Sequence, residues 1–311
     1  MAVRAETALA GATGQGELPG RVVVRHGAHL AVEDDEGRVW HCLFRQNLGE
    51  VVCGDRVAWQ PTGTEQGVVT ARLERTAVLS RPDYSGRDKA LAANLTRIVV
   101  VTAPRPEPSD YLIDQYLVAA EHVGIPALIA LNKVDLLDDA GREMMLLDLS
   151  RYPQADYPLV AVSAKRAHGL DPLMELLRGQ TSILVGQSGV GKSALVNALL
   201  PDREIQTGRL SEATGYGRHT TTAATLYHLP QGGELIDSPG VRSFRLGRLE
   251  RRDIEQGFRE FRPYLARCQF RDCSHAHEPG CAIRQAVDSG AIHPRRWENF
   301  LHLAAGVPSS H

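Results

Sequence analysis

Residues 182–193 read SILVGQSGVGKS and decide the fold, because an apolar strand, a phosphate loop and the start of a helix follow one another there. The second part matches G-x-x-x-x-G-K-[ST], in which glycines let backbone N–H groups wrap phosphates and the helix N-terminus favours negative charge. An apolar helical run, 194–200, follows as the motif requires. The stretch predicts an α/β nucleotide-binding domain with a mostly parallel sheet, and a chance glycine-rich turn is the alternative.

Two side chains of this loop have predicted roles at the phosphates. We expect Lys192 to reach the β- and γ-phosphates and the Ser193 hydroxyl to bind Mg²⁺. Only four of the chain's 35 basic residues are lysines, and Lys192 is one of them. A slim ammonium suits a phosphate loop where a planar guanidinium does not. The expected nucleotide contacts here are Gly186, Gln187, Ser188, Gly189, Val190, Gly191, Lys192, Ser193 and Ala194.

A second motif decides between ATP and GTP. Asn132, Lys133, Val134 and Asp135 follow the apolar run 127–131, where a base-reading loop lies in a doubly wound sheet. The Asp135 carboxylate can accept from N1–H and from the exocyclic amine of guanine, a donor pair that adenine lacks. We expect Asn132 to brace the loop and the Lys133 stem to lie along the base. An ATP-driven enzyme is the alternative, and it requires that Asp135 does not read guanine.

A shorter motif follows the next apolar run of the sequence. Ser163, Ala164 and Lys165 come after residues 159–162, and we expect them to offer a backbone N–H to guanine O6. Lys165 is, like the lysines of the two longer motifs, retained in a chain that otherwise uses arginine.

Two further motifs are expected to sense the γ-phosphate. Asp237 and Gly240 form a D-x-x-G pattern, in which the Asp holds Mg²⁺ through water and the Gly N–H meets the γ-phosphate. Between this pattern and the phosphate loop lie consecutive threonines at 220–222, of which we expect Thr221 to complete the Mg²⁺ shell. A threonine-rich edge strand is the alternative.

The group that activates water has to come from outside the D-x-x-G pattern. Val241 stands where many GTPases carry a water-orienting glutamine, and an aliphatic side chain cannot orient water. His219 lies in the loop expected to close over the γ-phosphate and is the candidate on chemical grounds. An exposed loop histidine without a catalytic part is the alternative.

The motifs run in a circularly permuted order. In ordinary small GTPases the phosphate loop comes first, whereas here the base-reading loops at 132 and 163 precede it. The same sheet can be built from a chain cut at another place, so the fold survives the change. Asp237 then leads almost directly into the C-terminal segment.

The sequence on either side of these motifs predicts flanking domains. Short alternating runs separated by Gly and Asp turns fit a small closed barrel, either an OB-fold or a generic β-barrel. After the last motif the chain becomes helical and rich in arginine. The predicted division is a disordered leader at 1–19, an OB-fold domain at 20–80, a permuted GTPase domain at 81–247 and a mainly helical zinc-binding domain at 248–311.

Cysteine and histidine cluster in the C-terminal segment. Cys268, Cys273, His275 and Cys281 supply three thiols and an imidazole within a short polar stretch. Such a set is typical of a closed tetrahedral site for one structural Zn²⁺, which leaves no open position for catalysis. His277 is the alternative to His275.

Charge is uneven along the chain. The formal net charge is −2, but twelve arginines face eight acidic residues from Val241 onward. Near the aromatic Phe270 and Trp297, this excess predicts a surface for RNA phosphates, and a solvated helical surface is the alternative. The arginines concerned are Arg262, Arg267, Arg271, Arg284, Arg295 and Arg296.

The lack of membrane-spanning and signal-like stretches in the sequence predicts the cellular compartment. No stretch approaches the roughly 18 apolar residues of a membrane span, and no signal-like apolar run opens the chain. An odd number of cysteines, five, argues against a disulfide framework. We expect a cytoplasmic monomer with no membrane partner.

Taken together, the motifs resemble the ribosome small-subunit-dependent GTPase family, RsgA. The stretches that carry the resemblance are NKVD at 132–135, SAK at 163–165, GQSGVGKS at 186–193, RHTTT at 218–222, DSPG at 237–240 and the Cys-Cys-His-Cys segment. The resemblance implies an OB-fold, a permuted G domain and a zinc domain that sit on the small (30S) subunit and its rRNA. It also implies late subunit maturation, release of an assembly factor, subunit-stimulated hydrolysis of GTP to GDP, and His219 as the water-activating residue.

Two features differ from the family pattern. Tyr216 stands where a basic residue is usual, and only a short segment follows Trp297, so we expect particular RNA contacts to differ.

The sequence predicts a GTPase that acts as a timer on the small subunit. An RNA-binding protein with GTP as a regulatory ligand is the alternative.

Overall fold

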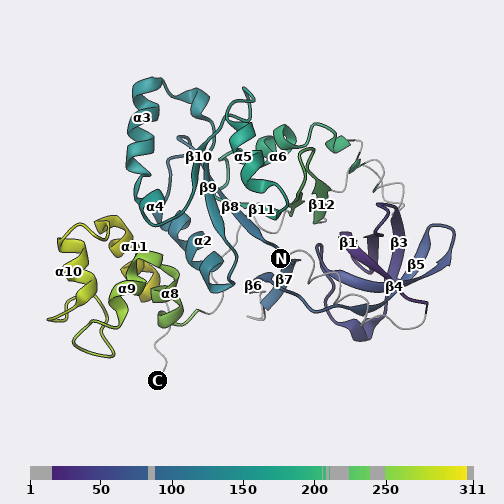
Figure 1. Cartoon of the computed structure of the whole chain (residues 1–311), viewed down its shortest axis with the longest axis horizontal. Coiled ribbons are helices and arrows are strands. Elements are labelled where there is room, and N and C mark those ends of the chain that lie inside the picture. The colour runs from purple at the N-terminus through teal and green to yellow at the C-terminus, as the bar shows by residue number, and fades with distance from the viewer. Residues whose placement is uncertain are drawn as a thin grey trace.

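Three regions of the protein lie in a row: a β-barrel, an α/β domain and a helical region (Figure 1). The computed structural model describes residues 16–82, 88–204, 206–207, 210, 224–238 and 249–306. The predicted fold class, a mostly parallel α/β domain between a barrel and a helical segment, is confirmed. Within these ranges, no helix has the length and apolar character needed to cross a membrane.

The N-terminal barrel is a closed ring of strands. They are β1 (Leu18–His26), β2 (His29–Glu33), β3 (Val39–Phe44), β4 (Arg56–Gly63) and β5 (Gln66–Arg72), with the 3-10 turn η1 (Gln46–Leu48) between β3 and β4. β1 pairs with both β2 and β4, and the parallel pair β3–β5 completes the ring. Trp59 fills the centre and is fully buried. A Cβ at Gly67 would lie 2.7 Å from the Trp59 ring, so the barrel needs glycine there.

The α/β domain continues the same sheet. Its strands, in spatial order, are β10 (Leu159–Ala161), β9 (Ala127–Leu131), β8 (Arg97–Thr102), β11 (Thr181–Val185), β13 (Glu234–Asp237) and β12 (Thr225–His228). All neighbours are parallel except β12, which runs antiparallel to β13. β12 also pairs with β1, so the barrel extends the sheet at this edge.

Helices cover both faces of this sheet. They are α2 (Asp110–His122), α3 (Asp139–Asp148), α4 (Arg151–Gln154), α5 (Leu170–Leu177) and α6 (Lys192–Leu199), with the 3-10 turn η2 (Val134–Leu136). Ile98 and Val100 of β8 share a core with α2, whereas Val99 and Val101 share a core with α5 and α6. Because successive strand side chains point to opposite faces, this alternation produces the three layers.

The C-terminal region is built from short helices docked on α2. They are α8 (Arg251–Gly257), η4 (Arg259–Phe261), α9 (Arg262–Leu265), α10 (Ala282–Asp288) and α11 (Pro294–Ala305). Phe258 and Phe261 stack in its core, Phe300 meets both rings edge-on, and Val118 of α2 belongs to the same cluster. A Cβ at Gly257 would lie 2.7 Å from Val118, so glycine lets the two regions meet closely.

A small hairpin that the sequence did not predict joins the barrel to the α/β domain. Its strands are β6 (Val78–Pro82) and β7 (Asp88–Ala93), and the boundary expected at residue 80 falls within β6. Asn94 ends it, accepting from the Thr76 N–H at 2.9 Å and donating to the Gly54 carbonyl at 2.9 Å. Because these contacts are long-range, the alternating pattern of the sequence did not indicate them.

Candidate functional site

The phosphate loop leaves the carboxyl end of β11 and enters α6 at Lys192. Gly186, Gly189 and Gly191 all have positive φ, at 141°, 86° and 91°. A Cβ at Gly186 would lie 2.2 Å from the Val101 carbonyl oxygen, so only glycine fits at the start of the loop. The Lys192 ammonium donates to the carbonyls of Gly186, at 2.7 Å, and Gln187, at 2.8 Å, which holds it against the loop.

Asn132 joins the base-reading loop to both of its neighbours. It lies directly after β9 and is 1% exposed. Its Nδ2 donates to the Val190 carbonyl of the phosphate loop at 3.0 Å, and its Oδ1 accepts from the Ala164 N–H at 3.1 Å. The side chain predicted to brace one loop therefore holds three loops together at the carboxyl edge of the sheet, where ligands bind in such folds.

Asp135 is an exposed carboxylate held by a buried partner. The Ser163 hydroxyl, itself 1% exposed, donates to Asp135 Oδ1 at 2.6 Å. This bond is the main cause that lowers the pKa of Asp135, and Lys165 and Arg166 lower it further. The carboxylate is ionised at neutral pH and oriented to accept hydrogen bonds.

Lys133 lies between the base-reading and phosphate loops. Its backbone is left-handed, with φ of 62°, and its ammonium donates to the Gly189 carbonyl at 2.5 Å and the Arg105 carbonyl at 2.9 Å. No motif in the sequence marks the segment of Arg105 and Pro106, which lies beside the phosphate loop: a Cβ at Gly189 would lie 3.4 Å from Pro106. Because this segment connects β8 to α2, only the folded sheet brings it to the phosphate loop.

Two of the three backbone N–H groups in the third loop, Ser163 to Lys165, are already bonded within the protein. The Ser163 N–H bonds to the His168 carbonyl, and the Ala164 N–H bonds to Asn132. Within the described residues, the Lys165 N–H donates no backbone hydrogen bond. Lys165 is therefore the residue of the predicted tripeptide whose N–H is available to guanine O6.

Asp237 ends β13 at the same edge of the sheet and is engaged by an arginine that the sequence did not single out. Arg203 Nη2 lies 2.5 Å from Asp237 Oδ2. Neither composition nor spacing marks Arg203, because its partner is distant in the chain. The other residues predicted at this side of the pocket, His219, Thr221 and Gly240, lie outside the described residues.

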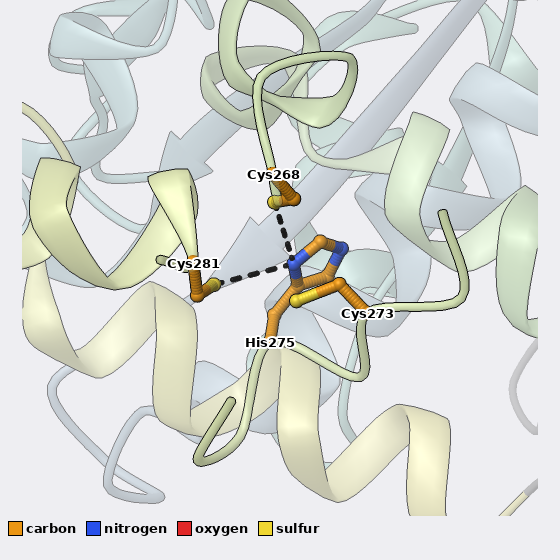
Figure 2. A group of neighbouring side chains, drawn as sticks. All are labelled: Cys268, Cys273, His275 and Cys281. Atoms are coloured by element: carbon orange, nitrogen blue, oxygen red, sulfur yellow. Dashed lines mark hydrogen bonds between the residues drawn. The ribbon is translucent and has the colours of Figure 1, made fainter. Parts of the chain in front are cut away.

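The cysteine cluster converges around one imidazole. Cys268, Cys273, His275 and Cys281 place their ligand atoms within 4.8 Å of one another (Figure 2). His275 Nδ1 lies 3.5 Å from the sulfurs of both Cys268 and Cys281. Zn–S and Zn–N bonds of roughly 2.3 and 2.0 Å make a tetrahedral N···S edge about 3.5 Å long, so the donor set fits zinc. His277 is exposed and is not part of the cluster.

The surroundings fix the histidine of this cluster. His275 has a φ of 60°, and its carbonyl accepts from Trp297 Nε1 at 2.8 Å. Glu255 lies 3.6 Å from His275 Nε2, on the side opposite the sulfurs. Burial raises the pKa of Cys273 to about 12, whereas a bound divalent cation would hold it as a thiolate. The site therefore suits a cation and disfavours free thiolates.

The predicted RNA surface is smaller than expected. Arg296 is 1% exposed and is bound by Asp114 of α2 and by Glu260, at 2.6 Å. The prediction that it contacts RNA is wrong, because the guanidinium joins two regions of the protein. Arg262 is half-exposed but paired with Glu121. Phe270 and Arg271 remain exposed.

Comparison with known families and proteins matches these features. The family model described as RsgA GTPase matches residues 72–247. A protein of Pseudomonas aeruginosa named small ribosomal subunit biogenesis GTPase RsgA is 49% identical over 294 residues, covering 94% of this chain and 87% of that protein. A protein of the same name from Ectopseudomonas mendocina is 48% identical, covering 98% of this chain and 90% of its own.

Solved structures show the same architecture. YjeQ from Thermotoga maritima superposes with a TM-score of 0.77 at 33% identity, covering 94% of this chain and 100% of that one. YloQ, described as a circularly permuted GTPase, superposes with a TM-score of 0.75 at 26% identity, covering 94% of this chain and 97% of that one. The barrel and helical region are thus shared along with the central domain.

Proposed function

The chain belongs to the RsgA GTPase family and is a GTPase, and from that premise we propose that it acts in the biogenesis of the small ribosomal subunit. The observation that carries the proposal is the side chain of Asn132, which joins the base-reading, phosphate and third loops into one pocket. One nucleotide can then be read at its base and at its phosphates at the same time. The relatives named for small-subunit biogenesis support the partner.

Guanine is recognised by Asp135 and Lys165 in this proposal. The ionised Asp135 carboxylate accepts from N1–H and from the exocyclic amine, and the Lys165 N–H donates to O6. The contacts also include Val134, and the Lys133 stem lies along the base. Asp135→Asn should lose GTP affinity by about 1.5–3 kcal/mol, since hydrogen bonds to a charged group are replaced. Unchanged GTP affinity, or equal competition by ATP, would remove the base assignment.

Phosphate and Mg²⁺ are held by the phosphate loop and the two sensing motifs. Lys192 leaves the loop carbonyls to contact the β- and γ-phosphates, and the Ser193 and Thr221 hydroxyls bind Mg²⁺. Asp237 holds Mg²⁺ through water, and the Gly240 N–H meets the γ-phosphate. Mg²⁺ supplies charge neutralisation at the transferring phosphoryl group.

His219 orients or deprotonates the attacking water in this proposal. The motivation is chemical, because Val241 cannot do so and an imidazole can. His219→Ala should lower subunit-stimulated hydrolysis by about 10²–10⁴-fold while nucleotide affinity changes little. A variant with full stimulated activity would remove His219 from the mechanism.

The flanking regions bind the subunit. One Zn²⁺ at the Cys₃His cluster holds the loops of the C-terminal region in place, and exposed groups such as Phe270 and Arg271 contact rRNA. The protein works as a cytoplasmic monomer that releases an assembly factor, and GTP hydrolysis to GDP times its own release.

Multiple-turnover GTP hydrolysis with and without purified small subunits tests the function. The proposal predicts faster turnover in the presence of small subunits, with large subunits as the matched control. If small subunits bind but leave turnover unchanged, the competing reading holds, in which GTP is only a regulatory ligand of an RNA-binding protein.

A further inference from the structure

Arg203 holds the carboxylate that the proposed mechanism assigns to Mg²⁺. Its Nη2 lies 2.5 Å from Asp237 Oδ2, and the two side chains are 22% and 31% exposed. This pair is only partly open to water, so solvent screens it less than a fully exposed pair.

Two further contacts fix the guanidinium at this position. Arg203 Nη1 donates to Asn197 Oδ1, and its guanidinium carbon lies 5.3 Å from the centre of the Tyr227 ring. Asn197 is four residues after Ser193 on α6, so the two side chains lie on the same face of that helix. Tyr227 lies on β12, beside the strand that carries Asp237. The arginine is thus placed between the helix of the Mg²⁺-binding hydroxyl and the strand of the Mg²⁺-binding carboxylate.

We propose that Arg203 sets the Mg²⁺ affinity of the nucleotide site by competing with Mg²⁺ for the Asp237 carboxylate. The inference rests on the proposed role of Asp237. The Asp237 carboxylate would attract both a hydrated Mg²⁺ and the guanidinium that contacts its Oδ2, and each cation disfavours the other by charge repulsion. Mg²⁺ binding therefore has to displace Arg203, which lowers the apparent Mg²⁺ affinity by the free energy of the ion pair.

When Mg²⁺ is scarce, Arg203 should favour nucleotide binding instead of opposing it. The paired Arg203 neutralises Asp237, so the phosphates of bound GDP do not face an uncompensated carboxylate. Removing the arginine should therefore strengthen nucleotide binding at high Mg²⁺ and weaken it when Mg²⁺ is chelated. These opposed signs separate competition from a general loss of stability, which would weaken binding under both conditions.

The test is binding of a fluorescent GDP analogue to the full chain over a range of free Mg²⁺. Arg203→Gln should lower the half-saturating Mg²⁺ concentration by about fivefold, the factor that corresponds to a partly exposed ion pair. Arg203→Lys keeps the charge but not the paired N–H donors of the guanidinium, so its half-saturating Mg²⁺ concentration should lie between those of wild type and Arg203→Gln. Arg178→Gln is the matched control, because it removes one charge from an exposed pair with Glu175 before β11 begins, and should shift the midpoint by less than about twofold.

Asp237→Asn distinguishes an error in the proposed role of Asp237 from an error in the proposed competition by Arg203. If its Mg²⁺ dependence equals that of wild type, the proposed role of Asp237 is wrong and Arg203 has nothing to compete for. If Asp237→Asn requires more Mg²⁺ but Arg203→Gln has the wild-type midpoint, or a higher one, only the competition is overturned. Arg203→Lys provides the same comparison should Arg203→Gln be poorly folded.

Discussion

The two flanking regions are attached to the central domain in different ways. The barrel is joined through strands: β1 pairs with β12, Arg21 of β1 lies 2.5 Å from Glu234 of β13, and His228 of β12 bonds to Glu33 of β2 at 2.9 Å. The helical region is joined through α2, where the buried Arg296 binds Asp114, which is fully buried. The first junction adds partly exposed polar bonds to buried apolar contacts that include Val23 and Ala31 of the barrel, and the second is an apolar core with a buried ion pair.

Chain connectivity gives this difference a functional meaning. β12 begins just after residues 211–223, which include His219 and Thr221, and β13 ends at Asp237. The barrel is therefore bonded to the two strands that lie between the predicted γ-phosphate sensors in the chain. The helical region is bonded to a helix whose preceding segment, at Arg105, touches Lys133. We expect the contacts at the barrel junction to change when the γ-phosphate is bound or lost. We expect the helical junction to keep the same contacts in both states.

The largest expected effect is the loss of metal from the helical region. Cys268→Ser removes one ligand, and structural zinc sites contribute roughly 10 kcal/mol or more to folding. Metal analysis should fall from one equivalent of zinc to well below it, and amide hydrogen exchange should rise across α8 to α11. The matched control, Cys42→Ser in the barrel, should keep its zinc; equal metal loss in both variants would contradict the assignment.

The next effect is the loss of the buried ion pair at the helical junction. Arg296→Gln leaves Asp114 without its charged partner, which should cost about 3–5 kcal/mol of unfolding free energy in urea. Its neighbour Arg295, exposed and paired with Glu298, is the control, and Arg295→Gln should change stability by less than about 1 kcal/mol. Similar losses of unfolding free energy in the two variants would contradict the burial of the Arg296–Asp114 pair.

A smaller effect is expected from the matching change at the barrel junction. Arg21 donates to Glu234 and to Thr181 Oγ1 at 3.0 Å, and its side chain is 20% exposed. Arg21→Gln should cost about 1–2 kcal/mol, less than Arg296→Gln, because water can replace part of the lost contact. If Arg21→Gln destabilises the protein as much as Arg296→Gln does, the proposed difference between the two junctions is wrong.

The smallest effect is a pH dependence confined to the barrel junction. The hydrogen bond to Glu33 raises the pKa of His228, and Glu234 raises it further, whereas burial and the charge of Arg21 oppose them. Because the folded-state pKa lies above the unfolded value of about 6.5, this stabilisation is complete below pH 6.5 and is lost as pH rises through the raised pKa. The pair is partly exposed, so we expect less than about 1 kcal/mol.

Variants of two histidines measure this effect. The stability difference between wild type and His228→Gln should shrink as pH rises from 6 to 9. His122→Gln at the helical junction, where His122 lies 3.6 Å from Asp253, is the control. A difference between wild type and His228→Gln that grows with pH would have the wrong sign for this account.

Local patterns predicted the architecture well. The apolar runs at 127–131 and 182–185 are strands, and the predicted helical run 194–200 lies largely in α6, because each pattern is set by burial of neighbouring residues. The metal cluster was also predictable, since Cys268 to Cys281 lie within one short segment. The choice that the sequence left open between His275 and His277 is decided by the cluster, which places His275 Nδ1 3.5 Å from the sulfurs of Cys268 and Cys281.

Contacts between distant segments were beyond the sequence. Nothing in the local pattern of Arg296 distinguishes a buried arginine from an exposed one, because Asp114 is far away in the chain. The same is true of Arg203 and its partner Asp237. The predicted roles of the nucleotide-contacting residues stay predictions, and those of His219, Thr221 and Gly240 lie outside the described residues.

The most direct test of the account is the rate at which the protein leaves the small subunit in its two nucleotide states. Dissociation is followed by fluorescence after loading with GDP or with a non-hydrolysable GTP analogue. If hydrolysis times release, the GDP form should dissociate at least about tenfold faster, a difference of roughly 1.4 kcal/mol in the stability of the complex. Equal dissociation rates in the two states would contradict it.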